Sequence, residues 1–170
     1  EKAAKRFEQL GCIVEEAHPD FSDVQDIFQT WRAMSFYVGK KALLDTNKDL
    51  LKPEVVWNIE RAAEITVDDF ARVELARARY LNRAVTFFEE YDLLLSPATV
   101  VPPYPVEQRF VAELGDYKFS NYVEWLSIAY AITITGHPAL SVPAGFTKDG
   151  LPVGLQIVGG PRGEANLLSA

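Results

Sequence analysis

Apolar residues recur at spacings of three and four in several stretches of this chain, and in short unbroken runs elsewhere. The first pattern is typical of amphipathic helices and the second of strands. Together they predict the order helix, strand, three helices, strand, long loop, helix, two strands, helix, which favours an α/β or α+β layer rather than a helical bundle. The predicted helices run from Lys2 to Leu10, from a cap at Asp20 or Ser22, from Pro53, from Thr66 to about Glu90, and from Ser120 to Ile134.

The most informative stretch lies between Gly136 and Gly160. It holds two apolar runs, Ala139 to Phe146 and Leu151 to Val158, separated by Thr147-Lys148-Asp149-Gly150. Asp-Gly between β-prone runs is a strong hairpin signal, because glycine accepts the positive φ that a tight turn requires. The second run is mostly apolar rather than alternating, so we expect a buried antiparallel pair with helices packed over it.

Two further runs predict short strands, Cys12 to Glu16 and Asp92 to Ser96. Pro97 ends the second of them. Residues 97 to 119 carry four prolines and predict a long irregular connection, and such a connection within a compact domain is often a functional loop.

Length and composition bound the class of protein. With 170 residues, 48% hydrophobic and 24% charged, we expect one folded domain over residues 1–170. A net charge of -7 without clustered Lys or Arg argues against a nucleic-acid partner, and the apolar runs are too short to span a membrane. The single cysteine, Cys12, lies in an apolar run, so we expect a buried thiol and a cytoplasmic protein.

The sequence contains no recognisable combination of catalytic, metal-binding or phosphate-binding residues. His18 and His137 each precede a proline, and neither has a second metal ligand at a suitable spacing. None of the seven serines lies in a Gly-x-Ser-x-Gly turn. Gly159 to Gly163 precedes a helix but lacks the residues of a phosphate-binding loop. We therefore predict no catalytic residue, no metal ligand and no cofactor within the chain.

Three segments nevertheless carry a resemblance: YDLLLSPAT from Tyr91 to Thr99, TGHPALSVPAGF from Thr135 to Phe146, and DGLPVGLQIVGGPRGEANLL from Asp149 to Leu168. In order and rough spacing they resemble the C-terminal third of the amidase signature family. This resemblance implies a mixed β-sheet core covered by helices and an amidohydrolase that uses a serine, a second serine in a cis peptide and a lysine. Those three residues lie upstream of the matching region in the family, so the resemblance places the triad outside residues 1–170.

The resemblance also implies which parts approach the substrate. The segment after Pro97 and the helix from Ser120 to Ile134 match regions of the family that line the pocket. Our candidates for substrate binding are therefore Thr99, Tyr122, Trp125 and Thr133. For each of them an ordinary core or surface role is an equal alternative.

The family has branches with different substrates. The A subunits of tRNA-dependent amidotransferases typically carry an arginine in the helix matching Pro53 to Ala62, and an Asn-Asp pair ahead of the last glycine motif. Here those places hold Trp57 or Asn58 and Trp125-Leu126. A charged, carboxylate-bearing substrate would lack its partners, so an aromatic, less polar pocket for a small or aryl-alkyl amide is favoured.

Both ends of the chain read as interrupted helices, so we expect a fragment whose partner is the remaining N-terminal part of the same protein. The isolated chain is expected to be inactive and to self-associate through the surface that this part covers. A homo-oligomer is left open. Two alternatives to the amidase are a non-catalytic binding or assembly domain and the A subunit of an amidotransferase.

Overall fold

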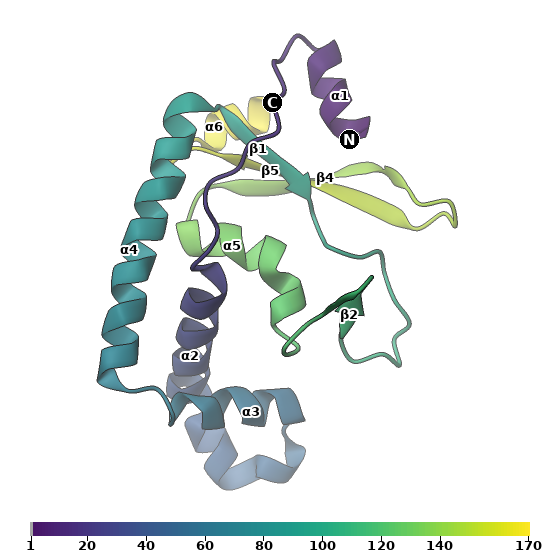
Figure 1. The fold of residues 1–170 in the computed structure, drawn as a ribbon. Helices are drawn as coiled ribbons and strands as arrows, with labels where there is room; N and C mark the ends of the chain where they lie inside the picture. Colours follow the sequence, from purple (N-terminus) through teal and green to yellow (C-terminus); the bar gives the residue numbers. More distant parts are fainter. Residues whose placement is uncertain (1) are drawn as a thin grey trace. The chain divides into compact units, whose positions relative to one another are not determined.

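The computed structural model describes residues 2–170, which divide into two compact units. Residues 21–80 form the first, which we call the helical unit, and residues 2–20 together with 81–170 form the second, the sheet unit. Figure 1 shows the elements of both along the chain. Helices and a β-sheet are both present, in agreement with the expected α/β class.

The helical unit consists of α2 (Val24–Asn47), a 3₁₀ turn η1 (Lys48–Leu50), α3 (Pro53–Ala62) and the first part of α4 (Val67–Glu90). Pro53 occupies the first turn of α3, as predicted, because its missing N–H has no partner there in any helix. The start of α2 was predicted wrongly, since the N-cap is Asp23 rather than Asp20 or Ser22. The buried apolar residues of this unit are Val24, Ile27, Ala33, Ile59, Ala62, Val73, Ala76 and Tyr80.

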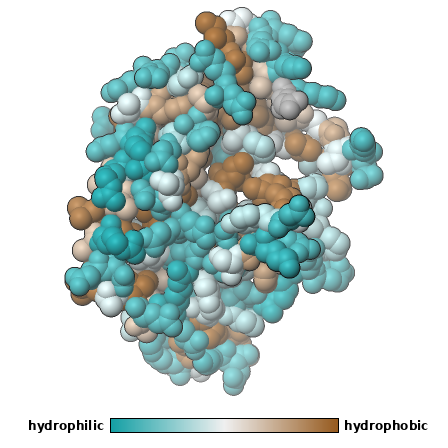
Figure 2. Space-filling model, in the orientation of Figure 1, coloured by the Kyte–Doolittle hydropathy of each residue, from teal (hydrophilic) through white to brown (hydrophobic). Residues whose placement is uncertain are grey.

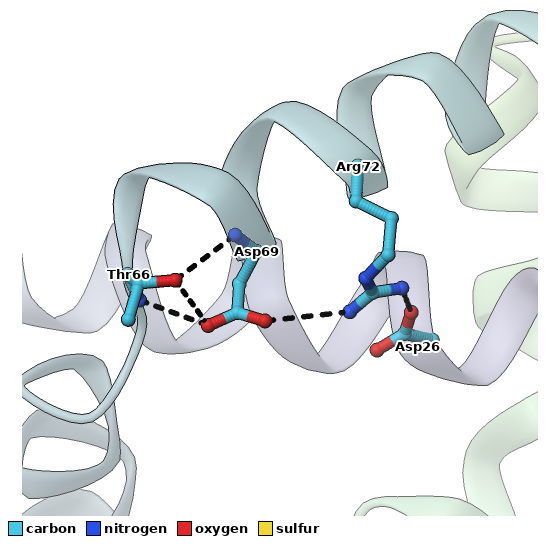
Figure 3. Close-up of polar contacts among 4 residues, drawn as sticks. All are labelled: Asp26, Thr66, Asp69 and Arg72. Atoms are coloured by element: carbon cyan, nitrogen blue, oxygen red, sulfur yellow. Dashed lines mark hydrogen bonds and ion pairs between the residues drawn. The ribbon is translucent and has the colours of Figure 1, made fainter.

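The first turn of α4 confirms the predicted cap (Figure 3). The Asp69 N–H donates to Thr66 Oγ1 at 3.1 Å, and the Thr66 N–H donates to Asp69 Oδ2 at the same distance. The Thr66 hydroxyl also donates to Asp69 Oδ2, at 2.6 Å, and this bond together with the one from the Thr66 N–H lowers the pKa of Asp69. Arg72 lies one turn further on, 3.9 Å from Asp69 Oδ1, and also pairs with Asp26 of α2. The capping box therefore begins α4 and continues into a link between two helices.

The sheet unit is organised around strands β1 (Leu93–Pro97), β4 (Ala139–Phe146) and β5 (Pro152–Gly159), in the order β1-β5-β4 (Figure 1). Both pairings are antiparallel. The predicted hairpin is confirmed: Gly150 has φ 79° and its N–H donates to the Thr147 carbonyl at 3.1 Å. A bulge interrupts the register between Pro143 and Gly145.

The expected burial of this hairpin is correct for only one end of it. Residues Ile157, Val158 and Gly159 of β5 are buried, whereas β4 alternates between exposed and half-buried positions and Phe146 is 76% exposed. Strand β4 is an edge strand, and the turn end of the hairpin extends beyond the other strand of the sheet (Figure 1). The residues there consequently keep contact with solvent.

Two other predictions in the sheet unit are wrong. Residues Cys12 to Glu16 follow α1 (Lys2–Gln9) but form no strand, and Cys12 is exposed rather than buried. The helix α1 itself ends as expected, at Gly11 with φ 96°. The amino-acid composition of Cys12 to Glu16 is typical of a strand, but no strand of residues 2–170 pairs with this segment.

The helix predicted from Ser120 begins later. A 3₁₀ turn, η2 (Glu124–Leu126), leads into α5 (Ser127–Thr135), which ends at Gly136 with φ 66°. Before η2, side chains take the backbone donors: Asn121 accepts from the Val123 N–H at 2.9 Å, and Glu124 accepts from the Ser120 N–H. Side-chain bonds of this kind compete with helix formation.

The connection over residues 97 to 119 is irregular, as predicted, but it contains a small unpredicted hairpin. This hairpin consists of strands β2 (Glu113–Leu114) and β3 (Tyr117–Lys118), which pair antiparallel. The chain then ends with α6 (Glu164–Ser169), and Leu167 on this helix is buried.

Many large apolar side chains lie at the surface of the described residues. Figure 2 shows hydrophobic side chains in several separate places on one face, among hydrophilic ones. The most exposed include Ile13, Val106, Val67, Val38 and Leu50. None of the helices within residues 2–170 combines the length and the apolar character needed to cross a membrane.

Candidate substrate-binding site

The four predicted site residues all lie in the sheet unit, on two neighbouring parts of it. Thr99 follows β1, Tyr122 precedes η2, Trp125 lies in η2, and Thr133 lies on α5. The position of Thr99 is set by the strand before it, because the Ala98 N–H donates to the Gly154 carbonyl of β5 at 3.0 Å. The sheet thus fixes where the long connection begins.

Two aromatic pairs join this connection to the residues around η2. The ring of Trp125 lies 5.8 Å from that of Tyr104, with an interplanar angle of 79°, and the ring of Tyr122 lies 6.2 Å from that of Phe110, at 61°. Edge-to-face pairs of this geometry are favourable beyond the area that they bury. We call these two pairs of rings together the aromatic group.

Tyr122 and Trp125 are the substrate-binding candidates of the sequence, and their role stays a prediction. Their ring partners Tyr104 and Phe110 were not expected. Their signal in the sequence is weak, because an aromatic residue in a proline-rich loop has no periodicity to show which neighbour it meets.

The two threonines make local bonds instead. The Thr99 hydroxyl donates to the Val101 carbonyl at 2.7 Å, and the Thr133 hydroxyl donates to the Ala129 carbonyl at 3.1 Å. Neither bond reaches the aromatic group. The structure therefore pairs Tyr122 and Trp125 each with a ring of the connection, and ties Thr99 and Thr133 to backbone carbonyls two and four residues away.

A buried carboxylate, that of Glu124, lies between Tyr122 and Trp125 along the sequence. Glu124 is only 6% exposed, and its two oxygens accept from the Tyr117 hydroxyl and from the Ser120 N–H. The bond to Glu124 raises the pKa of Tyr117. Burial raises the pKa of Tyr130 on α5 to about 12, with smaller contributions from the nearby Glu124 and Tyr117.

The sheet face beneath α5 is polar at its centre. Gln156 of β5 donates to Ser96 Oγ at 3.2 Å and to the Ile128 carbonyl of α5 at 3.3 Å. Ser96 and Ser141 are its partners in register on β1 and β4. These bonds fix α5, and with it η2, against the strands.

The two histidines do not join this site. His18 Nδ1 lies 2.9 Å from the Pro19 carbonyl oxygen. His137 packs edge-on against Phe88 at 5.0 Å between ring centres, and burial lowers its pKa. Residues 2–170 contain no group of three or more His, Cys, Asp or Glu side chains placed to hold a metal ion.

Solved structures that share this fold are larger than the chain. A bacterial aryl acylamidase of the amidase signature family superposes with a TM-score of 0.84 at 24% identity, over 99% of this chain and 37% of that one. A 6-aminohexanoate cyclic dimer hydrolase complexed with substrate superposes with a TM-score of 0.78 at 24% identity, over 98% and 37%. The fold is therefore that of part of an amidase signature enzyme, as the resemblance implied.

Sequence comparison gives the family. The model of the family described as Amidase matches residues 1–168, so the chain belongs to the amidase family. An acylamidase of Rhodococcus erythropolis is 29% identical over 169 residues, which are 98% of this chain and 35% of that protein. The A subunit of a glutamyl-tRNA(Gln) amidotransferase from Myxococcus xanthus is 44% identical over 99 residues, or 58% of this chain and 19% of that one. The chain spans about a third of the acylamidase, and is a portion of an amidase signature hydrolase.

Proposed function

We propose that residues 1–170 are the C-terminal portion of an amidase that hydrolyses a small or aryl-alkyl carboxylic amide through an acyl-enzyme. The serine, cis-serine and lysine of the triad belong to the part of the protein that precedes Glu1. One observation carries the proposal: nearly the whole chain aligns with an acylamidase, yet it spans only 35% of that protein, and it contains no catalytic set of its own.

In this proposal the sheet unit supplies scaffold and one wall of the substrate pocket. Tyr122 and Trp125 present aromatic surface to the acyl or aryl group, and Thr99 and Thr133 present hydroxyls beside it. Aromatic side chains suit such a wall because they bury a large apolar area at a small loss of conformational freedom. The partners are the amide substrate and the N-terminal part of the same protein, in the cytoplasm and without a cofactor.

The first test compares the isolated chain with the full-length protein. We expect the full-length protein to hydrolyse an aryl amide such as an anilide, and residues 1–170 alone to show no turnover. Turnover by the purified 170-residue chain would contradict the location of the triad. A full-length protein that folds and hydrolyses no amide would overturn the proposal altogether.

The second test concerns the pocket wall. In the full-length enzyme, Trp125→Ala should raise KM for an anilide by roughly 5-fold or more, because truncating a central aromatic contact typically costs upwards of about 1 kcal/mol. Trp125→Phe keeps a ring and should retain most of the affinity. Trp31→Ala, on α2 of the helical unit, is the matched control and should leave KM unchanged.

A second candidate, the A subunit of an amidotransferase, is favoured by the 44% identity over 99 residues to such a protein. On α3 the nearest arginine to the expected position is Arg61, which bonds to Gln29 and lies over the ring of Trp57, 5.2 Å from its centre. The guanidinium of Arg61 thus contacts residues of the helical unit, and these contacts compete with binding of a substrate carboxylate. Hydrolysis of glutamine or asparagine in preference to an anilide would favour the amidotransferase.

A non-catalytic binding or assembly domain is the remaining alternative. The coding sequence immediately upstream of Glu1 distinguishes the two classes. A lysine followed some tens of residues later by a run rich in glycine and serine supports the amidase, whereas a start codon or an unrelated domain supports the alternative.

A further inference from the structure

The long connection is tied to the residues around η2 by a third link, besides its two aromatic pairs. In this link the Tyr117 hydroxyl of β3 donates to the buried carboxylate of Glu124. The second oxygen of that carboxylate accepts from the Ser120 N–H. Glu124 therefore joins the end of the connection to the start of the helical segment that carries Trp125.

We propose that Glu124 is a positioning residue that, through Tyr117, holds the aromatic group in place and so determines preference for aryl over small aliphatic amides. The inference rests on the proposed function, and assigns to the Tyr117–Glu124 bond a part in substrate choice. Neither side chain needs to touch the substrate. They act through Tyr104 and Phe110, which the connection carries.

The hairpin that carries Tyr117 is too short to hold its own place. Strands β2 and β3 pair through only two residues each, and an isolated two-stranded hairpin is at best marginally stable in water. Tyr117 is 57% exposed, so burial does little to fix it. Tyr117 packs against Phe119 at 5.2 Å between ring centres, and its bond to Glu124 ties the hairpin to η2 beside the bond from the Ser120 N–H to the same carboxylate.

Glu124 in turn is held firmly. A buried carboxylate is stable only where hydrogen bonds replace its lost hydration, and here a backbone N–H and a phenol supply them. Its neighbour Val123 is fully buried. The carboxylate is thus a fixed point on η2 to which the more exposed hairpin attaches.

The connection is consequently anchored at both ends. The Ala98 N–H donates to Gly154 at one end, and Tyr117 donates to Glu124 at the other. Tyr104 and Phe110 lie between these anchors, and each meets a ring next to η2. Release of the second anchor should widen the range of positions that these two rings occupy, since a longer free segment has more conformational freedom.

The kind of substrate affected depends on whether it contacts the rings of Tyr104 and Phe110. An anilide or another aryl amide would use the rings of the aromatic group and should bind less tightly once they are no longer held. A small aliphatic amide such as propionamide is too small to depend on these rings. The effect should therefore appear in the ratio of the two KM values and leave kcat nearly unchanged.

The test uses the full-length enzyme with Tyr117→Phe, which removes the hydroxyl and keeps the ring. We expect KM for the anilide to rise by about 3- to 10-fold, the loss of one ordinary hydrogen bond. The KM for propionamide and both kcat values should stay within about 2-fold of the wild-type values. Glu124→Gln, which keeps an acceptor oxygen, should show a smaller change in the KM ratio than Glu124→Ala.

Tyr91→Phe is the matched control. The Tyr91 hydroxyl donates to Glu15 at 3.1 Å, so this variant also breaks a tyrosine–glutamate bond of the sheet unit, but one outside the connection. It should leave the KM ratio unchanged. An equal rise of both KM values in Tyr117→Phe, or no rise, overturns the inference while the amidase proposal stands. If the wild-type protein hydrolyses neither amide, the proposed function fails and this inference with it.

Discussion

The helical unit and the sheet unit differ in how far apart along the chain the residues lie whose interactions set the structure. In the helical unit the signals that begin two of the helices are local: Pro53 begins α3, and Thr66 with Asp69, three residues later, begins α4. In the sheet unit the deciding contacts join distant residues, such as Gln156 with Ser96, 60 positions away. The candidate site lies in the second kind of structure. The following substitutions test this difference by hydrogen exchange of peptides from each unit of the full-length protein.

The largest effect should follow loss of core volume in the helical unit. Ile59 on α3 is 1% exposed, and Ile59→Ala should lower the free energy of unfolding by about 2–5 kcal/mol through lost burial and the cavity left behind. Peptides of residues 21–80 should lose protection, and those of the sheet unit should keep it. Leu50→Ala, at a position that is 83% exposed, serves as the control. Equal loss of protection in both units would show that they unfold together.

The second effect depends on pH and tests the neighbourhood of Glu124. The pKa of Tyr130 is raised from 10.0 to about 12, so the folded state holds its proton more tightly than the unfolded state. The resulting stability is complete below pH 10 and is lost as pH rises through 12. Tyr130→Phe should remove this part of the pH dependence. A tyrosinate absorbance titration should show one tyrosine fewer ionising near pH 12, and an unchanged curve would contradict the burial of Tyr130.

A third substitution perturbs the sheet unit where the connection begins. A Cβ at Gly154 would lie 2.9 Å from Ala98 Cβ and 3.0 Å from Ser141 Oγ, so Gly154→Ala should destabilise by about 1–3 kcal/mol. Protection should fall at residues 93–98 as well as in β5. Gly39→Ala in α2 is matched, because nothing lies within 4 Å of its added Cβ, and it should stabilise by about 0.5–1 kcal/mol through helix propensity. The two variants should therefore differ in sign.

The smallest effect should come from the helix cap. Thr66→Ala removes the acceptor of the Asp69 N–H and should cost about 1 kcal/mol. Faster exchange should be confined to the first turn of α4. Thr86→Ala, exposed on the same helix, should change stability by less than about 0.5 kcal/mol. If Thr66→Ala disturbed the sheet unit as strongly as Gly154→Ala does, the contrast between local and distant control would be wrong.

Turns, helix ends and helix caps could be predicted, because each depends on residues only a few positions apart. The hairpin turn at Gly150, the end of α5 at Gly136 and the cap of α4 each need only a glycine or one side chain and a nearby backbone group. The strand expected at Cys12 to Glu16 shows the limit of such reasoning. A strand requires a partner, and composition alone does not supply one.

The candidate site was predictable only in part, for a similar reason. The resemblance pointed to Thr99, Tyr122, Trp125 and Thr133, and their role stays a prediction. Tyr104 and Phe110 could not be added, because their neighbours Trp125 and Tyr122 are 21 and 12 residues away along the chain. No periodicity connects an irregular loop to a helix start over that distance.

The sequence by itself determined the family, the starts of α3 and α4 and the hairpin between Gly136 and Gly160. These depend on motifs and on hydrogen bonds between near neighbours. The tertiary structure alone decided that β5 lies between β1 and β4, that Tyr104 and Phe110 meet the rings next to η2, and that Glu124 holds Tyr117. Each of these contacts forms only after the chain has closed a loop, and the partner is chosen by packing and by the need of a buried polar group for a bond.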